Sequence, residues 1–135
     1  MSGLVLKLGP FERVLINGAV IENGDRRARL VITTPEAKIL RLRDAIPPES
    51  AITPVRRVCY AVQLVLSGDA EAEAMRHQLL CSIEQLSQAL TDHDSRRLLS
   101  EASSAILGDH FYKALKSLRG LLPREDRLLA TAGSA

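Results

Sequence analysis

The chain has few aromatic residues and no tryptophan. Aromatic residues make up 3% of its 135 residues, whereas hydrophobic residues make up 46%. A core formed by this sequence must therefore be aliphatic, built mainly from Leu, Val, Ile and Ala. The shortage also argues against a sheet that stacks RNA bases on several aromatic side chains, because Phe11 is the only aromatic residue before Tyr60.

Recognisable catalytic motifs are also missing. The sequence contains no nucleophile elbow, phosphate-binding glycine loop, paired-histidine metal motif or Cys-x-x-Cys. His77, His93 and His110 lie in helical or helix-start contexts at no metal-ligand spacing, and we interpret them as surface residues. Cys59 and Cys81 fall on apolar faces of predicted helices and are interpreted as buried thiols. We therefore expect no catalytic residue, metal or cofactor, and a binding or regulatory protein rather than an enzyme.

Long hydrophobic runs are absent as well. No apolar stretch approaches the roughly 20 residues that span a bilayer. The first residues lack the basic segment and apolar segment of a secretory signal peptide. We therefore expect a cytoplasmic protein without a membrane partner.

Charge is present but is divided unevenly. Residues 1–57 contain 10 Lys and Arg against 6 Asp and Glu, whereas residues 58–135 contain 8 against 10. A basic first half and a mildly acidic second half favour different partners for each half. Ordinary solvated surface remains the alternative, because the positive excess is modest for a nucleic-acid binder.

The first half has the pattern of short β-strands. Five segments are rich in β-branched or alternating residues: Leu4–Leu8, Arg13–Ile16, Ala19–Glu22, Arg27–Ile32 and Lys38–Arg43. Asn17-Gly18 and Asn23-Gly24 each separate two of these segments, and Asn-Gly suits the positive φ angles of a tight type I′ hairpin turn. We expect an antiparallel β meander of about five strands, with Arg27 and Arg29 on one face.

The second half has the pattern of helices. Thr53-Pro54 is typical of a helix N-cap followed by a first-turn proline, and Gly68 is placed to end that helix. Helices are also expected from Asp69 to about Leu90, after Asp92, and after Asp109 up to Pro123. The fold class is thus α+β, with the meander followed by an antiparallel array of about four helices. We assign residues 1–45 to a basic β subdomain, 46–52 to a proline-rich connector, 53–130 to a helical subdomain and 131–135 to a frayed tail.

Two sets of candidate binding residues follow from these patterns. The basic set, proposed to bind RNA because guanidinium groups suit phosphates and exposed bases, is Arg13, Arg26, Arg27, Arg29, Lys38, Arg41, Arg43, Arg56 and Arg57. The alternative is that several of them pair with carboxylates on neighbouring strands. A partner-binding apolar seam is expected at Met75, Leu79, Ile83, Leu86 and Leu90, whose spacing is close to that of a coiled coil.

The segment from Glu12 to Arg27 contains both Asn-Gly pairs. In this segment the sequence resembles the FlbT family, whose members are regulators of flagellin synthesis in alphaproteobacteria. The resemblance continues through Ile39–Asp44, Thr53–Arg57 and Gln63–Gly68 and covers nearly the whole chain. The first turn differs: this chain has Gly9-Pro10-Phe11-Glu12 where the family usually has Pro-Gly-Glu.

The resemblance implies a post-transcriptional repressor that associates with the 5′ untranslated leader of flagellin mRNA and promotes its degradation during flagellum biogenesis. It also implies a small helical partner, the FlaF-type regulator, that works in opposition. The basic strands are similar to those of the CsrA class of mRNA-leader binders by analogy only, which adds a homodimer to the expectations. The alternative is an adaptor or chaperone in flagellum assembly that acts on flagellin or FlaF without contacting RNA.

Overall fold

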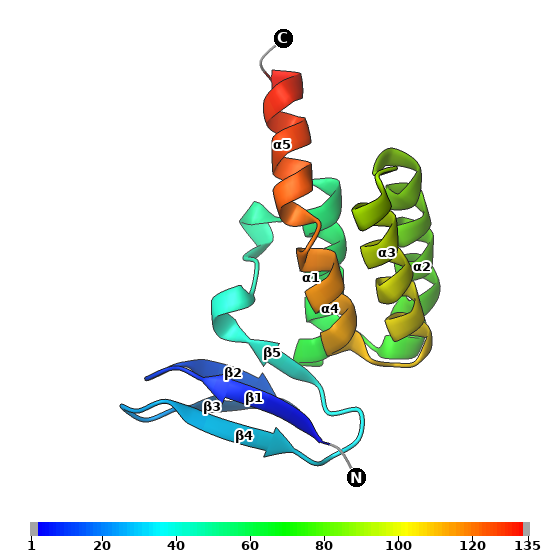
Figure 1. The fold of residues 1–135 in the computed structure, drawn as a ribbon. Coiled ribbons are helices and arrows are strands. Elements are labelled where there is room, and N and C mark those ends of the chain that lie inside the picture. The colour runs from blue at the N-terminus through cyan, green and yellow to red at the C-terminus, as the bar shows by residue number, and fades with distance from the viewer. Residues whose placement is uncertain (1–2, 134–135) are drawn as a thin grey trace.

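The computed structural model describes residues 3–133 and places the strands at one end of the molecule and the helices at the other (Figure 1). The strands are β1 (Leu4–Leu8), β2 (Arg13–Ile16), β3 (Ala19–Glu22), β4 (Ala28–Ile32) and β5 (Ile39–Arg41). Two short 3₁₀ helices follow, η1 (Leu42–Asp44) and η2 (Pro48–Ser50). The α-helices are α1 (Pro54–Ser67), α2 (Ala72–Ala89), α3 (His93–Leu107), α4 (Phe111–Arg119) and α5 (Leu122–Gly133).

The strands form two antiparallel sheets, so the predicted single meander is wrong. One sheet pairs β1 with β4, and the other has the order β3-β2-β5. In the first sheet Leu4 lies opposite Ile32 and Leu8 lies opposite Ala28. The α+β class and the order of strands before helices are confirmed. The predicted pairing of β3 with β4 does not form, because β4 pairs with the N-terminal strand β1 instead.

The two Asn-Gly pairs behave differently, which explains the change of sheet. Asn17 and Gly18 both have positive φ, 49° and 86°, and connect β2 to β3 as a tight hairpin. Neither Asn23 nor Gly24 has a positive φ. Instead, the Asn23 side chain donates from Nδ2 to the carbonyl oxygens of Gly9 at 2.7 Å and Arg26 at 2.8 Å. The second Asn-Gly pair therefore lies in the connection from one sheet to the other and does not form a hairpin turn.

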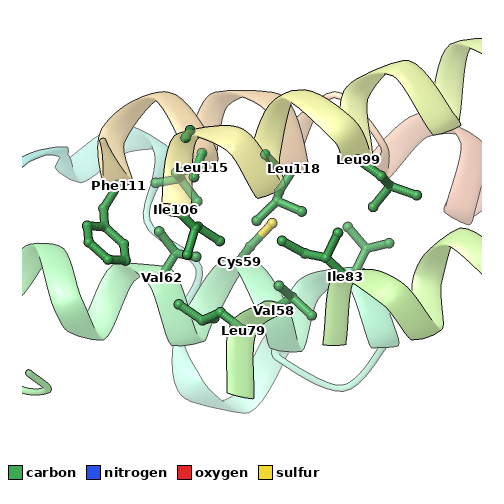
Figure 2. Close-up of a cluster of buried hydrophobic side chains, with 14 of the residues drawn as sticks. Val58, Cys59, Val62, Leu79, Ile83, Leu99, Ile106, Phe111, Leu115 and Leu118 are labelled. Atoms are coloured by element: carbon green, nitrogen blue, oxygen red, sulfur yellow. The ribbon is translucent and has the colours of Figure 1, made fainter. Parts of the chain in front are cut away.

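Helices α1 to α4 enclose an aliphatic core. α1 and α3 each contact both α2 and α4, so the four helices surround one cluster of side chains. Figure 2 shows Leu79 and Ile83 of α2 beside Val58 and Cys59 of α1. The predicted N-cap is confirmed, because Thr53 accepts a hydrogen bond from the Arg56 backbone N–H. Gly68 follows α1 with φ of 87°, as expected for a residue that ends a helix.

Among residues 3–133 there are five α-helices, one more than the predicted four. α4 ends at Arg119, and α5 begins at Leu122 with Pro123 in its first turn. Proline lacks a backbone N–H, which the first turn of a helix does not use, so Pro123 starts α5 rather than ending α4. α5 extends away from the sheets and includes residues 131–133, which the sequence pattern placed in the tail (Figure 1).

Four contacts hold the strands, and the segment that follows them, against the helices. Leu40 of β5 belongs to the helical core, and Tyr112 packs against the cores of both halves. The buried Gln63 amide of α1 accepts from the Ile46 N–H at 2.8 Å and donates to the Ile46 carbonyl at 3.1 Å. The Arg119 guanidinium donates to the Asp44 carbonyl at 2.6 Å. The backbone that follows β5 is thereby fixed on the helical half.

Candidate nucleic-acid interface

The nine predicted basic residues do not share one role. Several have carboxylate partners within the chain, as the alternative interpretation expected. Arg13 donates from Nε to Glu22 at 2.7 Å across the β2–β3 pair, with both side chains largely exposed. Ion pairs that are open to solvent contribute about 0–1 kcal/mol, so Arg13 retains a side chain that solvent or a ligand can reach.

Arg41 has a structural role. Its side chain is only 12% exposed and donates to the Glu12 carboxylate at 3.1 Å and to the Lys7 carbonyl at 2.9 Å. The Glu12 side chain, 6% exposed, also accepts from the Gly9 N–H at 3.0 Å. These bonds shape the turn between β1 and β2. Arg41 is therefore committed to the fold and is a poor candidate for ligand contact.

Arg56 is likewise engaged, here between α1 and α5. It donates to Asp126 at 2.9 Å and lies 3.5 Å from a Glu125 oxygen. The Asp126 hydrogen bond raises the pKa of Arg56 above its ordinary value, although burial acts in the opposite direction. Glu125 is itself buried and accepts from Thr53 Oγ1 at 2.5 Å and the Val55 N–H at 2.8 Å. This cluster joins the start of α1 to α5, far from the strands.

Four cationic side chains, by contrast, line one open cavity at the β1–β4 sheet. The cavity has a volume of about 480 Å³, and its lining consists of Lys7, Leu8, Gly9, Arg27, Ala28, Arg29 and Arg43. Among the described residues, Lys7, Arg27 and Arg29 form no salt bridge, and the lining contains no carboxylate. Arg43 is 61% exposed, and its Nε lies 3.5 Å from a Glu12 oxygen and 3.9 Å from an Asp44 oxygen, so both ion pairs are open to solvent on the Arg43 side. The cavity is thus a concentrated positive site.

Strand register explains how these cations come together. Lys7 and Arg29 lie directly opposite each other in the β1–β4 pair. Their neighbours along the strands, Leu6 and Leu30, face the apolar cluster on the other side. Like charges directly opposite in an antiparallel pair are destabilising. An anion bound between them removes that repulsion, which makes the arrangement suited to a phosphate.

The other predicted basic residues lie outside this cavity. Arg26 immediately precedes Arg27 and is exposed, but it does not line the cavity. Lys38 is held at the far end of the β2–β5 pair, where its backbone N–H donates to Asn17 Oδ1 at 2.9 Å. Arg57 is exposed on α1. The structure therefore gathers Arg27, Arg29 and Arg43 from the predicted set and adds Lys7.

Phe11 lies in the turn between β1 and β2, two residues after Gly9, and does not itself line the cavity. It has a φ of 59° in the β1–β2 turn, and its side chain is among the exposed large hydrophobic groups at 63%. Its backbone N–H donates to the Gly24 carbonyl at 2.8 Å. Lys7 could have been identified from the alternation of Leu6-Lys7-Leu8, whereas the position of Phe11 depends on the turn conformation.

Comparison with known proteins places the chain in a flagellar family. The model of the family described as flagellar protein FlbT matches residues 4–129. The chain belongs to the FlbT family.

Named relatives support this assignment. A probable flagellum biosynthesis repressor protein FlbT from Rhodopseudomonas palustris (strain TIE-1) is 36% identical over 127 residues, which cover 94% of this chain and 98% of the relative. The flagellum biosynthesis repressor protein FlbT of Caulobacter vibrioides (strain ATCC 19089) is 29% identical over 131 residues, covering 97% and 92%. No solved structure matches the chain.

In this FlbT-family chain the predicted partner seam is covered by the chain itself. Leu79, Ile83, Leu86 and Leu90 are 1–6% exposed in the helical core, and Met75 is partly buried against it. The spacing of 4, 4, 3 and 4 residues correctly indicates an apolar face that must be covered. α1 and α3 supply that cover, so a partner helix could contact the seam only if the helices separated.

The two cysteines of this FlbT-family chain differ in exposure. Cys59 is buried, and burial raises the pKa of its thiol to about 12. Cys81 is exposed on α2, with its Sγ 3.5 Å from His77 Nε2, so the prediction that it is buried is wrong. Only Cys81 is therefore accessible to reagents in the folded chain. Among residues 3–133, no helix is long and apolar enough to cross a bilayer.

Proposed function

We propose that this FlbT-family protein is a repressor in flagellum biogenesis that associates with the 5′ untranslated leader of flagellin mRNA and promotes its degradation. The repressor role is proposed from the relatives, which are named flagellum biosynthesis repressors. The contact with RNA is proposed from one structural observation, the cavity that Lys7, Arg27, Arg29 and Arg43 line. Localisation in the cytoplasm, where mRNA is translated, is part of the proposal.

The chemistry of the cavity supports a phosphate ligand. Arginine presents a planar fork of N–H donors that matches two phosphate oxygens, and lysine adds a point charge. Arg27 and Arg29 make no competing salt bridge among the described residues, so binding RNA costs them no internal partner. Arg41 and Arg56, which do have such partners, are left out of the proposed interface.

A binding titration with matched variants tests this interface. The probe is the flagellin leader RNA of the same organism, and the variant is Arg27→Ala/Arg29→Ala. Affinity should fall, and the slope of log affinity against log salt should decrease by about 1.4, from about 0.7 for each single-strand phosphate contact.

The control is Arg97→Ala/Arg127→Ala, which removes the same charge from α3 and α5. It should leave affinity and slope nearly unchanged. Equal losses in both double variants would show that only net charge matters and would remove the cavity from the proposal.

A second candidate function is an adaptor for flagellin or a FlaF-type partner without direct RNA contact. It is favoured by exposed apolar side chains outside the strands: Ile52, in the connector before α1, is 69% exposed, and Leu128 and Leu129 of α5 are 40% and 46% exposed. Purification without nuclease distinguishes the two functions. Nucleic acid that co-elutes and is released by salt supports the RNA-binding protein, whereas a nucleic-acid-free peak supports the adaptor.

A further inference from the structure

We propose that Phe11 is a stacking site for one unpaired base, so that the basic cavity accepts single-stranded rather than double-stranded RNA. This inference rests on the proposed function and specifies the form of RNA that the same surface binds. Such a stacking site requires three things. The aromatic ring must be open to solvent, the turn that carries it must be fixed relative to the cationic cavity, and the RNA must have unpaired bases.

Among the aromatic residues of the described chain, Phe11 is the one whose side chain is largely exposed. Its 63% exposure contrasts with that of Phe111, which is 5% exposed, and with Tyr60 and Tyr112, which are half-buried. An exposed phenylalanine gains little from burial in its own fold. Its ring is therefore free to bury its apolar face against a ligand.

The position of Phe11 relative to the cavity is fixed by hydrogen bonds. Gly9, which lines the cavity, donates to Glu12 Oε1 and accepts at its carbonyl from Asn23 Nδ2. The same Asn23 side chain bonds the Arg26 carbonyl, and the Phe11 N–H bonds the Gly24 carbonyl at 2.8 Å. The turn that carries the ring and the segment that carries Arg27 thus form one connected frame.

The backbone conformation adds an independent observation. A φ of 59° is readily adopted by glycine but is unfavourable for a bulky residue such as phenylalanine. Because the Phe11 side chain is exposed, burial in the core does not offset the cost of this backbone conformation. Strained conformations of this kind gather at ligand-binding sites, so a positive φ at an exposed aromatic residue supports a role for the Phe11 side chain in ligand contact.

The chemistry then selects single-stranded RNA. In a duplex the base faces are stacked on each other, so a ring beside the phosphates cannot reach one. In a single strand, an aromatic ring stacks on any base, while arginines hold the flanking phosphates. One ring provides one such contact, which suits a loop or unpaired leader segment.

The chain contains no tryptophan, which permits a direct optical test. Phe11→Trp introduces a single reporter, and its fluorescence should be quenched when an unpaired base of the leader RNA stacks on it. Phe11→Ala should weaken binding of single-stranded leader RNA by about 5- to 150-fold, from the usual contribution of one base–aromatic stack. Binding to the leader annealed to its complement should be the same for Phe11→Ala and the unmodified protein.

Val31→Ala is the matched control, because Val31 is another exposed apolar residue, 53% accessible, on β4. It should bind as the unmodified protein does, and thermal unfolding should confirm that each variant is folded. If the unmodified protein binds no leader RNA, the proposed function fails and the stacking site fails with it. If Arg27→Ala/Arg29→Ala weakens binding while Phe11→Ala does not and Phe11→Trp is not quenched, the stacking site alone is overturned.

Discussion

Replacing Glu12 by glutamine should destabilise the protein and thereby test how the β1–β2 turn is held. Glu12→Gln keeps an oxygen that can accept from the Gly9 N–H but removes the negative charge opposite Arg41. The Glu12 and Arg41 side chains are 6% and 12% exposed, and their atoms lie 3.1 Å apart. The change therefore leaves a nearly buried guanidinium without its counter-charge.

The expected cost follows from the remaining contacts. Hydrogen bonds to charged groups contribute about 1.5–3 kcal/mol each, and removing one partner of a buried pair costs about 3–5 kcal/mol. Arg41 keeps its 2.9 Å bond to the Lys7 carbonyl and some contact with water, which lowers the loss. We expect the free energy of unfolding to fall by about 2 kcal/mol, or the melting temperature by about 8 °C for a chain of this size.

Denaturant titration followed by circular dichroism measures this change. Glu22→Gln is the matched control, because the Arg13–Glu22 pair has the same chemistry but side chains that are 63% and 50% exposed. Its loss should stay below about 1 kcal/mol. Equal effects of the two substitutions would show that burial makes no difference to the stabilisation by these ion pairs.

The remaining predictions concern the helical core and the thiols. Leu79→Ala should lower the free energy of unfolding by about 2–5 kcal/mol because Leu79 is 1% exposed. Leu107→Ala, at a residue that is 64% exposed, should change it by less than about 0.5 kcal/mol. Comparable losses for both variants in denaturant titrations would contradict the assigned core. At neutral pH a thiol reagent should modify Cys81 alone in the folded protein and both cysteines after unfolding, and early modification of Cys59 would show that it is not buried. Burial raises the pKa of Cys59 to about 12 from 9.0, so the thiol loses its proton at a lower pH in the unfolded chain than in the folded chain. The free energy of unfolding should therefore fall as pH rises through this interval. A Cys59→Ser variant should lack this part of the pH dependence.

Local sequence signals predicted local structure well. Asn17-Gly18 formed the expected hairpin because both residues adopt positive φ with little cost. Thr53 capped α1 as expected, and the apolar spacing of α2 marked a face that is indeed covered. Each of these features depends on neighbours within a few residues in the sequence, so the pattern alone carries the information.

Long-range pairing was not predictable in the same way. The β1–β4 sheet joins residues that are twenty or more positions apart in the sequence. Asn23 holds the connection between the two sheets through side-chain hydrogen bonds that no local turn signal indicates. The candidate site shows the same limit. The sequence pattern selected Arg27, Arg29 and Arg43, but it could not separate them from Arg41, whose partner is reached only in the folded state.

Direct contact between the protein and flagellin leader RNA through the basic cavity can be tested in cells. Ultraviolet crosslinking in cells followed by sequencing of the attached RNA tests it most directly, with the unmodified protein compared with Arg27→Ala/Arg29→Ala at equal abundance. We predict crosslinked RNA enriched in the 5′ leaders of flagellin transcripts for the unmodified protein and a marked loss of that enrichment for the variant. Repression of flagellin by the unmodified protein without enriched leader RNA would show that the protein represses without direct contact with the leader.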